Sequence, residues 1–481
     1  MKRRQFIKTA AWGLGLAGLG GYCCSISVRP NILFIAVDDL RPELGCYGES
    51  HIISPNIDKL AREGVRFENS HCNVPVCGAS RASLLTGVRP SPQRFIYWHT
   101  WADKDLPGHL SLPRYLKQNG YHTISNGKIY HHRTDDMEAW SEEPWHPKGD
   151  WFDKGYLAEE TREKIIPNPR SDQPSSTIGP AWETADVDDS NYPDGKIADK
   201  SIRDLERLAK LDQPFFLGVG FKKPHLPFNA PKKYWDLYEH DEIQLTENSY
   251  IPENAPPESI HNSPELRYNY SGVPEAKPLP DDYAKWLVHG YQACVSYIDA
   301  LVGRVLDKLK ALKLADNTIV IFWGDHGWNL GEHTMWCKHC NYETSLSAPI
   351  IVKAPGMESD RVSNALVEFV DIYPSLVELC GLPIPEHCQG SSFVPLLKKP
   401  DREWKKATFS RYHQGNTVTT ERFQYTEYRD MQTDEFLARM LYDHERDPYE
   451  NINVAESAEY KEKVEQMAAL LQEGWKPHQR Q

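Results

Sequence analysis

The sequence predicts an α/β protein in which a large, mainly parallel sheet is sandwiched between helices and is followed by a smaller C-terminal α+β subdomain. Three observations predict this fold: short apolar runs, amphipathic helical stretches between them, and a change of pattern after about residue 381. Strands that alternate with helices form a parallel sheet with both faces covered. Ligands of such sheets bind beyond the carboxyl ends of the strands, so we expect the residues after each strand to carry the chemistry.

The individual elements follow from the spacing of apolar side chains. Buried strands are predicted where apolar residues run together, at residues 32–37, 215–219 and 318–323. Amphipathic helices are predicted at residues 57–63 and 293–312. These elements account for the centre of the predicted sheet and for part of its helical cover.

Two long stretches lack a clear period. Residues 142–198 and 252–280 are rich in Pro and polar residues, and we expect both to be ordered insertions, the second lining the mouth of a pocket. Further on, residues 409–428 alternate like antiparallel strands, and residues 456–475 have the pattern of an amphipathic helix. This change of pattern predicts the smaller C-terminal subdomain.

The N-terminus reads as an export signal. Arg3, Arg4 and Lys8 are followed by an uncharged stretch at residues 9–22, which is too short to span a bilayer. The paired arginines suggest twin-arginine export of a folded protein, to the periplasm or the cell surface. Cys23 or Cys24 is a candidate for lipidation, although Tyr22 is larger than such sites prefer. No later segment is apolar and long enough to predict a membrane span.

Charge and cysteine content narrow the classes of partner. The 481 residues carry a formal net charge of −13, which argues against general affinity for nucleic acid or an anionic membrane. An anionic substrate would therefore need a few cations inside a pocket. Cys337 and Cys340 resemble half a zinc site without a second half, so structural thiols or a strained bridge are the better interpretation. Cys380 and Cys388 would close a short, plausible disulfide loop in an exported protein.

Acidic residues follow two of the predicted strands. Asp38 and Asp39 come after the first strand, and Asp325 and His326 after the last. Single acidic residues in such places are usually turn formers or helix caps. Two clusters at one sheet edge would repel each other unless a cation neutralised them, and three carboxylates suit a hard divalent cation. His326 is an unusual ligand for calcium and leaves manganese or zinc open.

Cys77 stands at the predicted start of a helix that ends near Gly87. A helix N-terminus has unpaired N–H groups and positive potential, which favour anions and activate a nucleophile. Arg81 lies about one turn further on and can reach back towards Cys77. Seen alone, this pattern would be a buried cysteine near a surface arginine.

The run Cys77-Gly78-Ala79-Ser80-Arg81 resembles the signature of the type I, formylglycine-dependent sulfatases, which have the alkaline-phosphatase-like superfold. The likeness covers nearly all of the mature chain and is strongest to the iduronate-2-sulfatase group of that family. Other matching stretches, in the family's order, are residues 37–42, 54–58, 127–131, 223–228, 325–328 and 330–333. The resemblance implies an export signal at residues 1–28, a catalytic sulfatase domain at residues 29–380 and a C-terminal α+β subdomain at residues 381–481.

The resemblance also implies roles for particular residues. A calcium site, with magnesium or manganese as weaker alternatives, would be formed by Asp38, Asp39, Asp325, His326 and the formylglycine made from Cys77. The catalytic residues around the sulfate would be Cys77, Arg81, Lys128, His131, His225 and Lys338. The implied substrate is a sulfated oligosaccharide, above all one with a 2-O-sulfated uronic acid, and the implied partner is a formylglycine-generating maturase. Lysines and a cation suit the spread charge of a sulfate ester, and histidines can move its protons.

One departure and three rival interpretations stay open. The family usually has Pro where this chain has Ala79. This difference puts conversion of Cys77 by an oxygen-dependent maturase in doubt and favours conversion by a radical-type one. If neither maturase acts on the chain, it would be a pseudo-enzyme. The rivals are a sulfatase of another sugar or position, a phosphatase or phosphonate hydrolase of the same superfold, and a non-catalytic sugar-binding relative. Aromatic and histidine neighbours stay unassigned: His132, His333, His339, Trp98, His99 and Trp328.

Overall fold

The computed structural model describes residues 29–148, 155–173 and 175–479, so the predicted export signal lies outside the described residues. A seven-stranded sheet forms the centre, and all strands except β13 run in one direction. Its strands, in spatial order, are β14 (Arg361–Ser363), β2 (Val65–Phe67), β13 (Ile350–Lys353), β10 (Thr318–Gly324), β1 (Asn31–Asp38), β8 (Phe215–Pro224) and β4 (His122–Gly127). The predicted mainly parallel sheet is confirmed.

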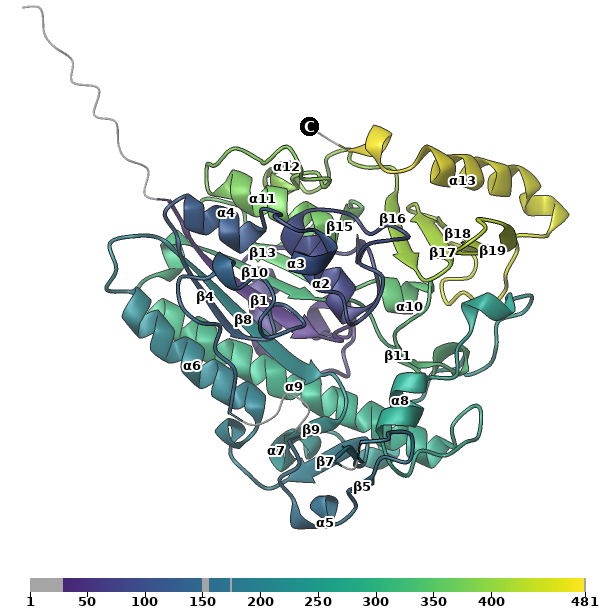
Figure 1. Cartoon of the computed structure of the whole chain (residues 1–481), viewed down its shortest axis with the longest axis horizontal. Helices are drawn as coiled ribbons and strands as arrows, with labels where there is room; N and C mark the ends of the chain where they lie inside the picture. Colours follow the sequence, from purple (N-terminus) through teal and green to yellow (C-terminus); the bar gives the residue numbers. More distant parts are fainter. Residues whose placement is uncertain (1–28, 149–154, 174, 480–481) are drawn as a thin grey trace, which may run out of the picture.

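The central strand β1 shows why the sheet needs cover on both faces. Successive side chains of a strand point to opposite faces. Leu33, Ile35 and Val37 join one buried cluster, whereas Ile32 and Phe34 join a second. The first cluster is covered by α1 (Pro55–Arg62), α6 (Pro193–Leu208) and α9 (Asp281–Ala311); the second by α2 (Cys77–Thr86), α4 (Leu112–Gln118), α11 (Ile372–Leu379) and α12 (Val394–Lys398). Figure 1 shows the two helical layers on either side of the sheet.

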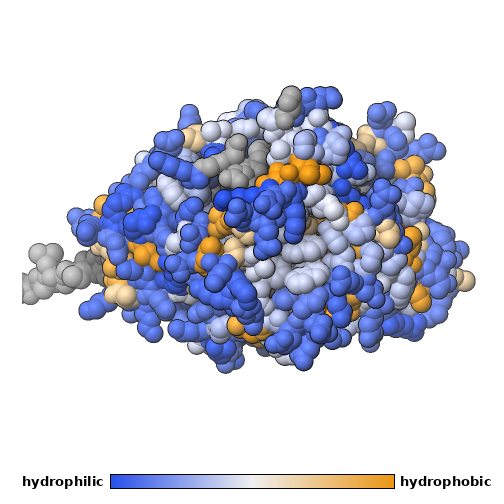
Figure 2. Space-filling model, turned by 90° about the horizontal axis from the view of Figure 1, so that it is seen from below, coloured by the Kyte–Doolittle hydropathy of each residue, from blue (hydrophilic) through white to orange (hydrophobic). Residues whose placement is uncertain are grey.

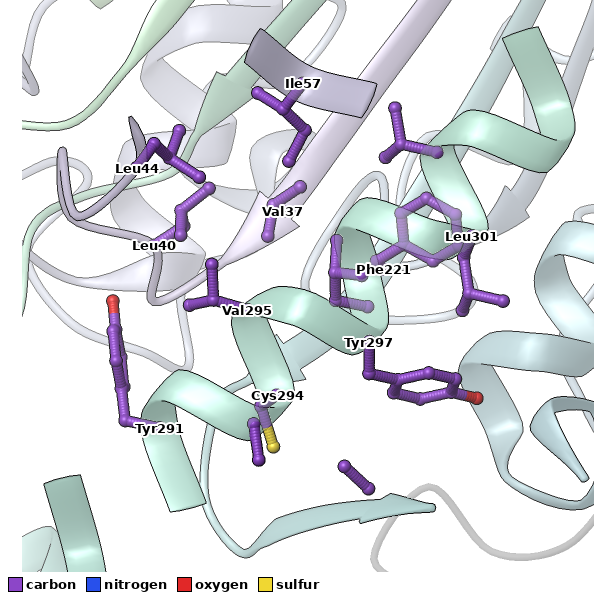
Figure 3. Packing of buried hydrophobic residues seen from close by; sticks show 14 of the residues in the cluster. Val37, Leu40, Leu44, Ile57, Phe221, Tyr291, Cys294, Val295, Tyr297 and Leu301 are labelled. Carbon is purple, nitrogen blue, oxygen red and sulfur yellow. The ribbon is translucent and has the colours of Figure 1, made fainter. Parts of the chain in front are cut away.

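The long helix α9 provides much of the cover of the first face. Its side chains Tyr291, Val295 and Leu301 lie among residues of β1, β8 and α1, including Val37 (Figure 3). The helix begins twelve residues before the predicted position, at Asp281. Its first turns are only partly buried, so their apolar period is weak and the sequence pattern becomes clear only where burial is complete.

The C-terminal subdomain is an antiparallel sheet with one helix packed on it, as predicted. Its elements are β16 (Thr408–Tyr412), β17 (Gly415–Thr419), β18 (Phe423–Arg429), β19 (Phe436–Asp443) and α13 (Lys461–Glu473). Val418, Leu441 and Val464 form its own small core. Helix α12 follows residue 381 in the chain but packs into the core of the main sheet through Leu397. The domain boundary at residue 381 stays a prediction.

The described parts of the two insertions contain more regular structure than expected. Helix α6 begins at Pro193, inside the first stretch that lacked a clear period. The remaining short elements are α3 (Ala102–Asp105), α5 (Glu159–Arg162), α7 (Lys232–Trp235), α8 (Pro264–Asn269), α10 (Glu343–Leu346), β3 (Ser70–His71), β5 (Ile166–Pro167), β6 (Thr177–Ile178), β7 (Trp182–Ala185), β9 (Phe228–Pro231), β11 (Asn329–Leu330), β12 (Trp336–Cys337) and β15 (Val367–Glu368). All eight cysteines of the described ranges are free thiols, so the disulfide considered for Cys380 and Cys388 is not formed.

The surface carries scattered apolar groups. Figure 2 shows small hydrophobic patches set among hydrophilic side chains on one face of the molecule. Across the described residues, each helix is too short or too polar to cross a bilayer.

A buried histidine–carboxylate pair ties the C-terminal sheet to the main domain and predicts a pH-dependent stability. Glu450 accepts from His444 Nε2 at 3.1 Å, from Gln424 Nε2 at 2.7 Å and from the backbone N–H of Glu343 at 2.8 Å. Burial alone would lower the pKa of His444. The negative charge of Glu450, with those of Glu343 and Asp447, instead raises this pKa to about 9. The folded pKa exceeds the unfolded one, so this stabilisation is present below about pH 6.5 and is lost as pH rises through 9.

We expect unfolding free energy to fall by on the order of 2–3 kcal/mol between pH 6.5 and 9.5 from this pair, measured by urea denaturation. The His444→Gln variant should have a flatter profile over that interval. Equal slopes for the two proteins would contradict the prediction.

Candidate active site

Four neighbouring parallel strands end at or just before residues that were predicted to belong to the active site. In spatial order, Asp325 follows β10, Asp38 ends β1, His225 follows β8 and Lys128 follows β4. The carboxyl ends of parallel strands meet at one edge of the sheet, so residues far apart in the chain become neighbours. The structure therefore brings together, at this edge of the sheet, side chains from motifs that are far apart in the sequence.

The two acidic clusters are joined through the backbone of Asp39. This residue has a φ of +60°, a left-handed turn directly after β1, and its N–H donates to Oδ1 of Asp325 at 2.9 Å. Tyr291 of α9 donates its hydroxyl to the carbonyl of Asp39 at 2.9 Å. Burial raises the pKa of the Asp39 carboxyl to about 8. The nearby charge of Asp38 adds to this rise, whereas His225 and Lys338 lower the pKa and offset part of it. Holding this carboxylate ionised requires further positive charge close by.

Asp38 has the opposite electrostatic setting. Burial alone would raise its pKa, but Lys128 and then Arg81 hold it well below its usual range. Lys128 Nζ bonds one carboxylate oxygen, and Arg81 Nη2 donates to the other at 3.3 Å. Asp38 is therefore a permanent anion beside two cations.

Arg81 links the strand ends instead of standing free. The side chain is fully buried and its Nε donates to Oδ2 of Asp325 at 2.9 Å. Nη1 donates to the carbonyls of Lys128 and Ile129, and Nη2 reaches Asp38. Most of the five guanidinium donors are thus used by protein acceptors, so the structure makes Arg81 a support for the carboxylates more than a free ligand for a substrate anion.

Cys77 is the first residue of α2, which agrees with its predicted place at the N-terminus of a helix. Its Sγ lies 3.2 Å from His131 Nδ1, and the residue is 3% exposed. The next residue must be glycine, since a Cβ at Gly78 would lie 2.2 Å from the carbonyl oxygen of Trp98. Burial, with Lys128, holds the pKa of His131 well below its usual range, so this imidazole is neutral beside the sulfur.

Lys338 and His225 meet on the far side of Asp39, together with a carboxylate that the sequence analysis missed. Lys338 Nζ lies 3.0 Å from both oxygens of Asp39 and 2.8 Å from Oε1 of Glu265. His225 Nε2 is 3.1 Å from the same Glu265 oxygen. The only sequence signal for Glu265 was its place in the insertion at residues 252–280, which was expected to line the pocket mouth.

The donor set at this edge fits a metal ion. His326 Nε2 is fully buried and finds no hydrogen-bond partner among the described residues, although it lies 3.4 Å from Oδ1 of Asp39 and 3.6 Å from Oδ1 of Asp325. A lone imidazole nitrogen that faces buried carboxylate oxygens is what a bound cation would satisfy. Asp39, Asp325 and His326 form such a group, and Asp38, Asp39 and His225 form an overlapping one.

A second acidic–histidine group serves as a contrast. Asp103, His109 and Asp136 also lie close enough to hold an ion. Both oxygens of Asp136 already accept from protein donors, among them Arg114 Nε at 3.0 Å and Tyr130 OH at 2.9 Å. The arginine supplies the counter-charge there, so this group is a buried ion-pair network.

Comparison with known proteins places the chain in a family. A sulfatase family model matches residues 30–382, and a model for the C-terminal region of N-sulphoglucosamine sulphohydrolase matches residues 331–476. Iduronate 2-sulfatase of Mus musculus is 35% identical over 421 residues, covering 78% of this chain and 74% of that protein. A sulfatase of Formosa agariphila is 32% identical over 471 residues, covering 92% and 86%.

Solved structures share the fold at lower identity. A protein solved in complex with its substrate D-glucosamine-2-N,6-O-disulfate has a TM-score of 0.73 at 23% identity, covering 94% of this chain and 98% of that one. A phosphonate monoester hydrolase of Agrobacterium radiobacter has a TM-score of 0.75 at 22% identity, covering 92% and 95%. These two likenesses support the fold alone. With the family model spanning the whole main sheet and the curated relatives above 30% identity, the chain belongs to the sulfatase family and is a sulfuric ester hydrolase.

Proposed function

We propose that this sulfatase releases sulfate from a sulfated saccharide, most of all from a 2-O-sulfated uronic acid, with a nucleophile made by conversion of Cys77 to formylglycine. The observation that carries the proposal is Cys77 at the N-terminus of α2, 3.2 Å from His131 and beside a group of buried carboxylates and lysines. Iduronate 2-sulfatases among the relatives support the uronic acid. The solved relative in complex with a disulfated glucosamine supports a sulfated sugar more generally.

Two groups that the described atoms do not include would complete the site. Formylglycine, when hydrated, supplies a hydroxyl that can attack sulfur and a second hydroxyl whose deprotonation frees the sulfate, which a plain thiolate cannot do. A divalent cation, calcium by our proposal, would be held by Asp38, Asp39, Asp325 and His326 with residue 77, and would stabilise negative charge as the ester reacts.

The chain's own residues would bind the sulfate and move protons. Lys128 and Lys338 flank the carboxylates and would contact the sulfate oxygens, where positive charge matches the charge of the transition state. His131 is neutral and adjacent to residue 77, so it would remove the proton that accompanies sulfate release. His225, on the opposite side, would protonate the departing sugar oxygen. Arg81 would hold the carboxylates of Asp38 and Asp325 in place.

A hollow beside Lys338 suits the sugar. It has a volume of about 200 Å³ and is lined mostly by polar and aromatic side chains, among them Tyr412, Gln414 and Tyr428 of the C-terminal subdomain and His339 next to Lys338, together with Glu258 and Ile260. Burial lowers the pKa of His339 to about 3, so this ring is neutral. Hydroxyl groups and ring faces of a saccharide fit such a lining, which supports a sugar over a small inorganic ester.

The test combines mass spectrometry across Cys77 with assays of sulfate release, on protein made together with a maturase. Conversion of the thiol to an aldehyde and release from a 2-O-sulfated uronate disaccharide are the expected results. Conversion with release only from other sulfated sugars, such as a glucosamine 6-sulfate, would keep the sulfatase and discard the uronate. An unconverted cysteine under aerobic and anaerobic maturases would overturn the formylglycine.

Ala79 offers a prediction about maturation. It is the third residue of α2, where the first-turn N–H is not needed by the helix, so proline is tolerated there. We expect the Ala79→Pro variant to be converted more completely than the native chain by an oxygen-dependent maturase, as measured by the aldehyde fraction at residue 77. The same substitution should leave the melting temperature within about 2 °C, because its effect on stability is below about 1 kcal/mol.

Export is part of the same proposal. A saccharide polymer is met outside the cytoplasm, and the pair Arg3 and Arg4 would direct the folded protein there. Replacing both arginines with lysine should leave the protein in the cytoplasmic fraction. Unchanged fractionation would remove the twin-arginine route.

A further inference from the structure

Glu265 is a largely buried carboxylate at the centre of the site with no role assigned so far. It is the second residue of α8, and its side chain is 13% exposed. Oε1 lies 2.8 Å from Lys338 Nζ and 3.1 Å from His225 Nε2. Glu265 comes from a separate insertion and contacts two groups of the proposed chemistry. These contacts favour a role in the reaction over a role in folding alone.

The charge state of Glu265 is settled by its neighbours. Burial by itself would raise its pKa, but Lys338 and then His225 hold the pKa of this carboxyl well below its usual range. Glu265 is therefore an anion and can only accept hydrogen bonds. Lys338 is shared between this anion and Asp39, which fixes the ammonium between two carboxylates.

The contacts of His225 fix the orientation of its ring. Nδ1 lies 2.6 Å from the carbonyl oxygen of Leu226, which only accepts, so Nδ1 bears a hydrogen. Nε2 faces two further acceptors, Glu265 Oε1 at 3.1 Å and Asp39 Oδ2 at 3.8 Å. Of the two, only the contact with Glu265 is within hydrogen-bond distance.

We propose that Glu265 is a positioning residue that holds the ring of His225 in the orientation from which Nε2 passes a proton to the departing sugar oxygen. This inference rests on the proposed sulfatase reaction of the same site. As the nucleophile bonds to sulfur, the bond between sulfur and the sugar oxygen breaks and its electron pair stays on that oxygen. The oxygen takes the Nε2 proton and leaves as an alcohol, His225 becomes neutral, and Glu265 remains a carboxylate. A sugar alkoxide is a poor leaving group, so this proton has a large effect on the rate.

The first test is the Glu265→Gln variant, which keeps the shape of the side chain and removes its charge. We expect kcat for a sulfated saccharide to fall about 10- to 100-fold, the range typical for a partner that orients a reacting group, and KM to change less than about 3-fold. The matched control is Glu275→Gln, an exposed residue of the same insertion, which should behave as the native enzyme. A loss confined to KM would mean that Glu265 contacts the sugar directly and would overturn the inference.

A double-mutant cycle with His225→Gln separates positioning from support of the fold. If Glu265 acts through His225, adding Glu265→Gln to the His225→Gln variant should lower kcat by less than about 2-fold, because the group it positions is gone. An equal fall in both backgrounds would show an independent or structural role and would reject the inference. Thermal unfolding of all four proteins checks that each is folded. Aldehyde at residue 77 without any sulfate release by the native enzyme would instead reject the proposed function, and this inference with it.

Discussion

The Cys77→Ala variant is expected to lose sulfate release by at least about 10⁴-fold, because removal of a nucleophile leaves only binding and electrostatic stabilisation. No other described cysteine contacts the proposed catalytic histidines; Sγ of Cys77 lies 3.2 Å from His131 Nδ1. The Cys77→Ser variant should be equally inactive with a maturase that oxidises only thiols. Initial rates on a sulfated disaccharide, with residue 77 followed by mass spectrometry, measure the effect.

Cys72 provides the control. It is also buried and lies five residues before Cys77, but its Sγ donates to the carbonyl of Ser345 at 3.7 Å and its side chain packs in the hydrophobic core. The Cys72→Ala variant should therefore be converted at Cys77 and should keep activity within about 3-fold, at a stability cost of roughly 1–2 kcal/mol. If Cys77→Ala retained more than a hundredth of native activity, the formylglycine nucleophile would be wrong.

The sheet and the edge that carries the chemistry were predictable because their signals are local. A short apolar run rich in β-branched residues, such as residues 318–323, favours a buried strand, and an acidic pair directly after a strand lies where ligands bind. The start of α2 at Cys77 followed from its glycine and small residues, and its end from Gly87, which caps the helix with a φ of +68°. The resemblance to a family then gave each of these residues a role.

The parts that were not predictable depend on contacts between segments far apart in the chain. Glu265 reaches Lys338 across 73 residues from an irregular insertion, and no pattern around it marks it as buried. Arg81 was predicted to lie beside the sulfate; that four acceptors on other elements also hold its guanidinium is something only the folded chain could reveal. Periodicity describes one element at a time; the pairing of buried charges is decided by tertiary packing.

Removal of the divalent cation is expected to affect stability as well as activity, which makes the metal testable without turnover. Asp39 is fully buried with its pKa raised to about 8 despite the nearby Lys338, and His326 Nε2 finds no partner among the described residues, so a bound cation would stabilise the ionised carboxylate and satisfy the imidazole. An ion bound at 100 to 1,000 times its dissociation constant stabilises the fold by about 3–4 kcal/mol. In a chain of this size that corresponds to a fall in melting temperature of roughly 3–4 °C on chelation.

The Asp325→Asn variant should abolish this response. Asp325 follows β10 and accepts from Arg81 and the Asp39 N–H, so losing its charge weakens ion binding while the amide keeps part of the hydrogen bonding. We expect its melting temperature to be insensitive to chelator and its activity to fall at least about 10³-fold. Asp316→Asn, an exposed aspartate just before the other end of β10, should respond to chelator as the native protein does. Add-back of calcium, magnesium or manganese to the native protein identifies the ion by the stability that returns. A native melting temperature indifferent to chelation and to all three ions would show that Lys338 and Lys128 alone balance the carboxylates, and the metal would have to be given up.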